Sequence, residues 1–280
     1  MKQTDSNRVS SLFDLSGRVA IVTGGAGLLG RRHGEILAAA GAHVVVLDLA
    51  SAQPEQWAAQ LQQQCGRSCL GFVADITDEG SLCRARELVV EALGRIDILI
   101  NNAANNPKVE DGNKNWSRLE NLPVEVWEAD IRVGLTGAFL CSRVFGAQML
   151  KEGAGVILNI ASDLALIAPD QRLYRIEGLP AEQQPVKPVT YSVVKTALIG
   201  LTRYLASYWA KDNIRVNAIS PGGVFNGQSE DFLQRLNQLI PMGRMAHNDE
   251  YQGAILFLCS DASSYMTGAN LVVDGGRTCL

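Results

Sequence analysis

Short apolar runs rich in β-branched residues alternate along this chain with longer amphipathic stretches, and this alternation constrains the possible fold most strongly. The runs cover residues 18–23, 43–48, 69–74, 96–101, 155–160, 214–219 and 270–273. Several of them, such as VVVL at 44–47, contain no polar residue, as is typical of strands buried on both faces of a parallel sheet. Helical periodicity occurs at 28–40, 81–93, 123–151, 190–210 and 249–259. The pattern predicts an α/β fold with a doubly wound parallel sheet.

The chain of 280 residues fits one domain, which we expect to span residues 15–280 after a polar N-terminal arm at 1–14. Two segments, 104–122 and 163–189, lack the periodicity of a strand or a helix. Long loops in a compact domain usually carry function, so these two segments are candidates for a binding region.

Composition argues against several classes of protein. The net charge of −4, with no basic cluster, argues against nucleic-acid binding. No apolar stretch approaches the length of a membrane span and the N-terminus has no apolar signal region, so we expect a cytoplasmic protein without a membrane partner. The six cysteines are scattered and the three histidines lack partners at metal-ligand spacing, which predicts reduced thiols and no metal site.

A glycine-rich turn, TGGAGLLG at 23–30, joins the first strand to the first helix. Glycines allow the chain to turn tightly and to approach a pyrophosphate, and the helix N-terminus offers free N–H groups to the phosphates. The position of Gly24, Gly27 and Gly30 between a strand and a helix predicts a Rossmann-type dinucleotide site.

The second strand ends at Asp48, 18 residues after Gly30. A carboxylate at this position accepts hydrogen bonds from the ribose hydroxyls of NAD and repels the 2′-phosphate of NADP. Residues 49–51 supply no cation, which favours NAD as the cofactor. Arg31 and Arg32, in the first turn of the helix, are an alternative feature that would favour a phosphate.

Further motifs follow in order: VADIT at 73–77, NNAA at 101–104, NIAS at 159–162, YSVVK at 191–195, IRVNAISPGG at 214–223 and YMTGANLVVDGG at 265–276. As an ordered set they resemble the short-chain dehydrogenase/reductase family from about Leu15 to the C-terminus. The resemblance implies that Tyr191 is the catalytic acid/base, that Lys195 activates it and that Ser162 binds the substrate oxygen. Physical chemistry agrees, because a lysine one helical turn away favours the phenolate of a tyrosine.

The same resemblance implies a set of cofactor contacts. Asp75 is expected near the adenine, Asn101 near the adenosine ribose, and the backbone at 221–224 beside the nicotinamide. The full set expected to contact NAD is Gly24, Gly27, Leu29, Gly30, Asp48, Asp75, Ile76, Asn102, Ala103, Tyr191, Lys195, Pro221, Gly222 and Val224.

Gly134 departs from the family pattern, which usually has an asparagine there that bends the helix and holds a proton-relay water. We therefore expect a water or another side chain near Lys195 to take over that role. An asparagine restored at Gly134 is expected to crowd the helix.

The gap from Ser162 to Tyr191 is 29 residues, about twice the usual family gap. The insertion carries Arg172 and Arg175. We hypothesise that one of them binds an anionic or hydroxyl-rich group of the substrate. Residues 225–240 are expected to form the second wall of the pocket. The insertion and the closing GGRTCL also resemble a branch of the family linked to bacterial surface-sugar biosynthesis.

These features predict an NAD(H)-dependent oxidoreductase that transfers a hydride between nicotinamide and a secondary alcohol or ketone of a polar, carbohydrate-type small molecule. One alternative is a 3-oxoacyl thioester reductase, which Asp48 disfavours because that chemistry usually uses NADPH. Another is an NAD-binding subunit without turnover. The family usually builds homodimers or homotetramers through two central helices, and residues 133–149 and 193–209 are apolar around their circumference, as such an interface requires.

Overall fold

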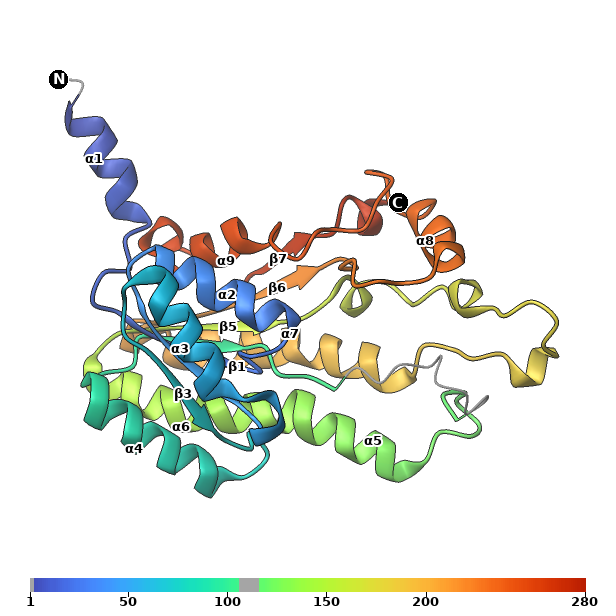
Figure 1. The fold of residues 1–280 in the computed structure, drawn as a ribbon, viewed down its shortest axis with the longest axis horizontal. Coiled ribbons are helices and arrows are strands. Elements are labelled where there is room, and N and C mark those ends of the chain that lie inside the picture. Colours follow the sequence, from blue (N-terminus) through green and yellow to red (C-terminus); the bar gives the residue numbers. More distant parts are fainter. Residues whose placement is uncertain (1–2, 106–115) are drawn as a thin grey trace.

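The computed structural model describes residues 3–105 and 116–280, and within them seven strands form one parallel sheet in the order β3-β2-β1-β4-β5-β6-β7 (Figure 1). The strands are β1 (Val19–Thr23), β2 (His43–Asp48), β3 (Cys69–Val73), β4 (Ile98–Asn101), β5 (Gly155–Ile160), β6 (Ile214–Pro221) and β7 (Asn270–Val273). All seven predicted strands are present, with ends displaced by at most two residues. The predicted doubly wound Rossmann-type sheet is therefore confirmed.

Helices cover both faces of the sheet (Figure 1). One layer contains α2 (Leu28–Ala39), α3 (Pro54–Cys65) and α9 (Gln252–Cys259), and the other contains α4 (Glu79–Leu93), α6 (Gly137–Glu152) and α7 (Val189–Trp209). Helix α3 was not among the helices expected from the sequence. Its glutamine-rich run hides a narrow apolar stripe of Trp57, Ala58 and Leu61, which packs into the core.

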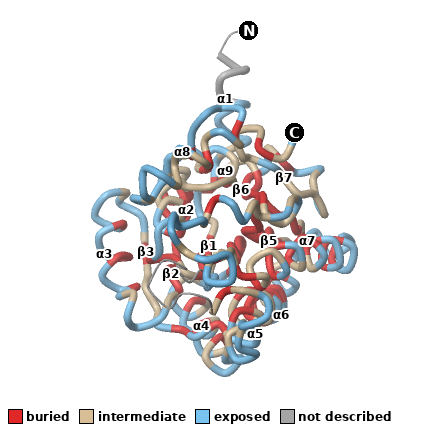
Figure 2. The backbone as a smooth tube through the Cα atoms, turned by 90° about the vertical axis from the view of Figure 1, so that its right-hand side faces the viewer, coloured by how far each residue is buried: buried red, intermediate tan, exposed pale blue. Residues whose placement is uncertain are grey.

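Two apolar cores lie on the two faces of the sheet. Side chains alternate along each strand, so that Ala20 and Val22 of β1 join the core beneath α2, whereas Val19 and Ile21 join the core beneath α6. Both sets are fully buried, which explains why the strand sequences are continuously apolar. Figure 2 shows the buried residues concentrated along the central strands, with the exposed residues on the outer helices and loops.

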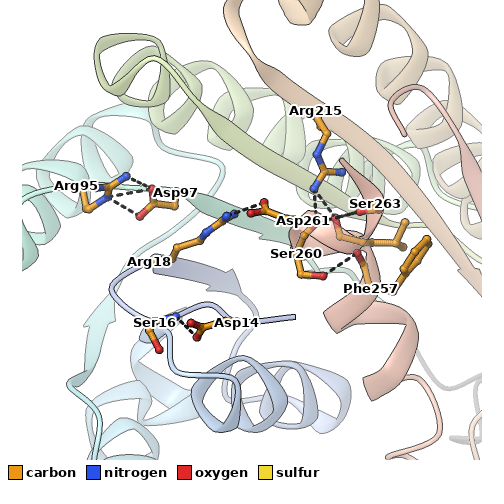
Figure 3. A network of polar contacts seen from close by, with 11 residues as sticks. Asp14, Ser16, Arg18, Arg95, Asp97, Arg215, Phe257, Ser260, Asp261 and Ser263 are labelled. Carbon is orange, nitrogen blue, oxygen red and sulfur yellow. Dashed lines mark hydrogen bonds and ion pairs between the residues drawn. The ribbon is translucent and has the colours of Figure 1, made fainter. Parts of the chain in front are cut away.

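The amino ends of the strands are held by a polar network that Figure 3 shows from close by. The guanidinium of Arg18 donates to Asp261 at 2.7 Å, and that of Arg215 donates to the carbonyl of Ser260 at 2.9 Å. Asp97 accepts hydrogen bonds from the Val19 amide and the Arg95 side chain, both at 2.8 Å. These contacts tie strands β1, β4 and β6 together at one edge and leave the carboxyl edge to form the site.

Helix α5 (Val124–Ile131) runs into α6 through a π-helical turn at Arg132–Thr136. By length and composition alone, the continuous helix Val124–Glu152 would suffice to cross a membrane, with a mean hydropathy of 1.3 over its most apolar window. Of that window, 56% is buried inside the fold, where residues of α6 pack against the sheet and α7. The expectation that no apolar stretch approaches this length was thus too strict, because a core helix can share the length and composition of a span.

The remaining helices lie outside the two layers. The N-terminal arm contains α1 (Gln3–Leu12), which stands away from the sheet in Figure 1 and was not expected to be helical. Helix α8 (Glu230–Asn237) lies beyond the carboxyl end of β6. The irregular segment 163–189 contains short 3₁₀ helices at Asp163–Ala165, Gln171–Tyr174 and Ala181–Gln183. The other irregular segment, 104–122, lies partly outside the described residues.

Candidate active site

A cleft of about 740 Å³ opens along the carboxyl edge of the sheet. Its lining comes from the segments that follow β1, β2, β3, β4, β5 and β6, together with α7, the insertion and α8. Open α/β sheets bind ligands at this edge, because the loops that leave parallel strands meet there.

The glycine-rich turn at one end of the cleft needs glycines for steric reasons. Gly24 has a left-handed backbone with φ +59°, and a Cβ there would lie 2.9 Å from the Cα of Ala103. A Cβ on Gly30 would lie 2.2 Å from the Gly24 carbonyl oxygen. Gly30 does not line the cleft and allows the helix to pack against the turn, so its expected contact with the cofactor stays a prediction.

Gly27 is the N-cap residue of helix α2, and no side chain caps the amide groups of the first turn. These amides and the positive end of the helix dipole are available to an anion beside Gly24 and Leu29, which line the cleft. This arrangement fits a dinucleotide pyrophosphate.

Asp48 lies at the same end of the cleft, where β2 ends. Its carboxylate accepts hydrogen bonds from the amides of Ala26 at 3.0 Å and of Leu49 at 2.9 Å. The nearby arginines are engaged elsewhere, because Arg31 stacks 4.7 Å from the Trp57 ring centroid and donates to the Ala26 carbonyl. Neither Arg31 nor Arg32, which pairs with Glu35 at 2.8 Å, lines the cleft.

The next two strands also bring expected residues into the cleft. Asp75, Ile76, Asn102 and Ala103 line it. The Asn102 side chain donates to the carbonyls of Thr23 and Gly24 at 2.9 and 3.0 Å, so it fastens the glycine turn.

Asn101 was expected near the adenosine ribose, and that expectation is wrong. Its side chain points into the core, where its amide nitrogen donates to Asn159 at 2.8 Å and to Ser142 at 3.1 Å. The period-2 alternation of β4 places Asn101 and Asn102 on opposite sides, and only Asn102 faces the cleft.

Ser162, Tyr191 and Lys195 come together midway along the cleft, as expected. Ser162 follows β5 and lies beside Tyr191, whose pKa its side chain acts to lower. Lys195 lies one turn after Tyr191 on α7, with its Nζ 5.8 Å from the tyrosine ring centroid. The buried ammonium donates to the Ile160 carbonyl at 2.7 Å, which fixes its position.

Burial shapes the acid–base properties of this group. It lowers the pKa of Lys195 to about 8, with a further contribution from Lys187. Burial raises the pKa of Tyr191, and the Ser162 side chain acts in the opposite direction. A tyrosine beside an ammonium can exchange a proton with a bound alcohol or carbonyl oxygen.

The backbone at 221–224 forms the wall opposite Tyr191, as expected, with Pro221, Gly222 and Val224 in the lining. The Tyr251 hydroxyl donates to the Gly222 carbonyl at 3.0 Å, and the Gly222 amide donates to the Val273 carbonyl at 2.9 Å. These bonds hold the segment rigidly beside the catalytic group.

Gly134 lies inside the π-helical turn and packs against α7. A Cβ at this position would lie 2.5 Å from Cγ1 of Val194, so the close packing of the two helices explains the glycine. Beside it is a small cavity of about 10 Å³, lined by Asp130, Thr190 and Lys195 among others, roughly the space one water molecule needs. The Thr190 hydroxyl donates to the Asp130 carboxylate at 2.6 Å, which puts an acidic group within this lining.

The insertion forms a wall of the substrate end, but not through its arginines. Arg172 is 85% exposed and pairs with Asp170 at 2.6 Å, and Arg175 is also exposed and does not line the cleft. The hypothesis that one of them reads the substrate is not supported by this arrangement. Leu173, Tyr174 and Lys187 face the cleft instead.

Helix α8 supplies the facing wall, which confirms the expectation for residues 225–240. Leu173 of the insertion packs with Leu236, Ile240 and Met245 in a third, separate apolar cluster. The Arg235 guanidinium donates to the Arg175 carbonyl at 2.6 Å and so fastens α8 to the insertion.

Two buried charged residues at the substrate end, Asp163 and Arg277, were not identified from the sequence. Asp163 accepts a hydrogen bond from the Ser162 hydroxyl at 2.8 Å, and its second oxygen lies 3.5 Å from the Arg277 guanidinium. Burial raises the pKa of Asp163, whereas Ser162 and Arg277 lower it. Their only signal in the sequence is that each follows a strand end, at β5 and β7.

Within residues 3–105 and 116–280, no group of three or more histidine, cysteine, aspartate or glutamate residues is arranged to hold a metal ion.

Comparisons with known proteins agree with this geometry. A family model described as short chain dehydrogenase matches residues 18–173, and one described as enoyl-(acyl carrier protein) reductase matches residues 179–278. The chain is 35% identical to the D-threitol dehydrogenase of Mycolicibacterium smegmatis, covering 99% of both chains. It is 34% identical to the NAD-dependent glycerol dehydrogenase of Listeria innocua, covering 95% of this chain and 96% of the relative.

A solved structure of a gluconate 5-dehydrogenase from Burkholderia cenocepacia, in complex with NADP and tartrate, shares the fold with a TM-score of 0.85. The identity is 27%, and the match covers 97% of this chain and 99% of that one. Family models, relatives and fold agree, and the chain belongs to the short-chain dehydrogenase/reductase family.

Proposed function

We propose that this protein is an NAD(H)-dependent dehydrogenase that interconverts a secondary alcohol and a ketone on a small polyol or sugar-type substrate. The observation that carries the proposal is the convergence of Ser162, Tyr191 and Lys195 between a dinucleotide-type turn and a polar substrate end. When bound, the nicotinamide accepts or returns the hydride.

The residues of the chain transfer the proton that accompanies the hydride. In alcohol oxidation, the phenolate of Tyr191 takes the hydroxyl proton of the substrate, and in reduction Tyr191 gives it back. The Lys195 ammonium favours the phenolate because an opposite charge nearby stabilises the ionised form. Ser162 orients the reacting oxygen, and Asp163 holds Ser162 through the bond to its hydroxyl.

The preference for NAD over NADP rests on Asp48. Its carboxylate lines the cleft at the end of β2, where the adenosine ribose of a bound dinucleotide would lie. Arg31 and Arg32 are held by other partners and do not line the cleft. A 2′-phosphate would meet negative charge there without compensation from Arg31 or Arg32.

The proposed substrate class rests on the chemistry of the substrate end. Asp163, Gln228 and Arg277 line this end and offer donors and acceptors to several hydroxyl groups. Relatives named for threitol, glycerol and gluconate dehydrogenation support a small hydroxylated substrate. The link to surface-sugar biosynthesis stays a prediction.

A specific observation favours a second candidate. The apolar cluster around Leu173, Phe232 and Leu236 would also suit the acyl chain of a 3-oxoacyl thioester. An NAD-binding subunit without turnover is the third candidate, against which the intact catalytic group argues.

The test is a nicotinamide absorbance assay with both cofactors against polyols, sugar acids and 3-oxoacyl thioesters, with dissociation constants for NADH and NADPH from titration. We expect turnover of a polyol or sugar acid with NAD and tighter binding of NADH. Turnover confined to thioesters with NADPH would overturn the proposal, and NADH binding without any turnover would favour the non-catalytic subunit.

We also propose a homodimer or homotetramer built through α6 and α7. The outward face of α7 exposes the stacked rings of Tyr204 and Tyr208, which are 65% and 66% exposed, and α6 exposes Phe139. Light scattering of the wild type and of the Tyr204→Glu/Tyr208→Glu variant tests this; we expect the charges to release monomers, and a monomeric wild type would contradict it.

A further inference from the structure

Lys187, in the return arm of the insertion, lies beside the catalytic group. Its ammonium sits 4.0 Å from the ring centroid of Tyr191, nearer than the 5.8 Å of Lys195. Lys187 precedes α7, which begins at Val189, so its position does not follow from helical spacing. The part of the insertion that leads back to α7 places Lys187 beside Tyr191.

The backbone of Lys187 is held from two sides. Its amide donates to the Gln171 side chain at 2.8 Å, and the same side chain donates back to the Lys187 carbonyl at 3.4 Å. The preceding amide, of Val186, donates to the Ser117 hydroxyl at 3.2 Å. Contacts with Gln171 of the same insertion and with Ser117 therefore fix the backbone at Lys187 beside the catalytic group.

The charged groups around Tyr191 come from several elements. Lys195 lies on the same helix, Asp163 follows β5, Asp130 ends α5 and Lys187 ends the insertion. Tyr251 is a further titratable neighbour, at the start of α9. Burial lowers the pKa of Lys187 to about 8, while Asp130 and Asp163 act to raise it, so Lys187 is predominantly a cation at neutral pH.

We propose that Lys187 is a second activating cation for Tyr191, through which the insertion stabilises the phenolate and sets the pH range of catalysis. The proposal rests on the proposed oxidoreductase function with Tyr191 as the proton-transfer group. An ammonium over a tyrosine ring is attracted to its π face, and the attraction becomes that of a full charge pair when the phenol loses its proton. Lys187 acts through Tyr191 and is a positioning residue in this reaction.

The test compares the pH dependence of kcat/KM for alcohol oxidation in the wild type and in Lys187→Met and Lys187→Arg. Oxidation requires the phenolate, so the rate rises as pH rises through the apparent pKa of the Tyr191–lysine cluster. For Lys187→Met we expect this midpoint to move up by about one pH unit, with a roughly tenfold loss at neutral pH and rates that converge at high pH. Lys187→Arg keeps the cation and is expected to retain a midpoint close to that of the wild type.

A second readout does not depend on turnover. The tyrosinate ultraviolet difference spectrum between each protein and the same protein carrying Tyr191→Phe isolates the titration of Tyr191, and its midpoint should move up in Lys187→Met. Arg172→Ala is the matched control, because Arg172 lies in the same insertion and its exposed side chain pairs with Asp170. It should leave both midpoints and the NADH dissociation constant unchanged.

The outcomes separate this inference from the proposed function. An unmoved midpoint in Lys187→Met, with the same fractional loss of rate at every pH, would mean a purely structural role and overturn the inference. The inference is also overturned if Lys187→Arg loses as much activity as Lys187→Met while both variants remain folded by thermal denaturation. A fully active Tyr191→Phe would instead overturn the assignment of the active site itself.

Discussion

The two ends of the cleft are built in different ways. At the cofactor end, Gly24 and Gly27 lie in the short turn that directly follows β1, and Asp48 is the last residue of β2. At the substrate end, the wall joins Leu173 to Leu236 and Met245, residues more than 60 positions further along the chain. A strand followed by a turn therefore determines the cofactor site locally, whereas the substrate wall depends on contacts between distant segments.

Tyr191 lies where the two ends meet, and its replacement is expected to have the largest effect. Tyr191→Phe removes the proton-transfer group and should lower kcat by roughly 10²- to 10⁴-fold. The NADH dissociation constant should change little, because the phenol does not hold the dinucleotide alone. Stopped-flow or steady-state rates with parallel NADH titration measure both; a large loss of NADH affinity would show that the two ends are not separable.

The cofactor end is tested by Asp48. Asp48→Ala removes the charge that opposes a 2′-phosphate. The preference for NADH over NADPH should therefore fall by roughly tenfold or more, and tenfold corresponds to about 1.4 kcal/mol of binding free energy. The substrate KM should stay within about twofold if the two ends are independent. The Asp48 carboxylate also accepts hydrogen bonds from the amides of Ala26 and Leu49. Asp48→Asn is therefore the control, because it removes the charge and keeps a hydrogen-bond acceptor. A preference that survives in both variants would contradict the role of the charge.

Gly134 tests the packing beneath the catalytic group. Gly134→Ala would place a Cβ 2.5 Å from Val194, and overpacking of this kind should destabilise the protein by about 1–3 kcal/mol. The second substitution in Gly134→Ala/Val194→Ala removes the clashing methyl group and should recover part of the loss, as denaturant unfolding would reveal. An equal loss in the single and double variants would place the strain elsewhere.

The smallest effect is expected for the arginines of the insertion. Arg172→Ala and Arg175→Ala should leave kcat and KM within about twofold, because neither side chain lines the cleft and exposed ion pairs contribute little. Leu173→Ala, which opens the apolar wall between them, should raise KM several-fold by loosening the pocket. Kinetics that reverse this order would mean that the insertion moves its arginines into the cleft when substrate binds.

Several features could be predicted from the sequence because their causes are local. Continuous apolar runs led to all seven strands, and the spacing of glycines and Asp48 led to the cofactor end. Helix α3 escaped detection because its polar run of glutamines hides a stripe of three apolar residues. Asn101 was misplaced because a one-residue difference along a strand reverses the face on which a side chain lies.

The sequence by itself determined the parallel sheet and the glycine turn, since each depends on a periodicity or a spacing within one element and its neighbours. The roles of Ser162, Tyr191 and Lys195 were implied by the resemblance of the ordered motifs to the family. Only the tertiary structure decided which polar residues of the insertion face the cleft. Burial of Leu173 against α8 turns Arg172 outward, while Gln171 and Ser117 hold the arm that brings Lys187 to Tyr191. Such placements depend on packing free energy between segments far apart in the chain, which local sequence patterns do not encode.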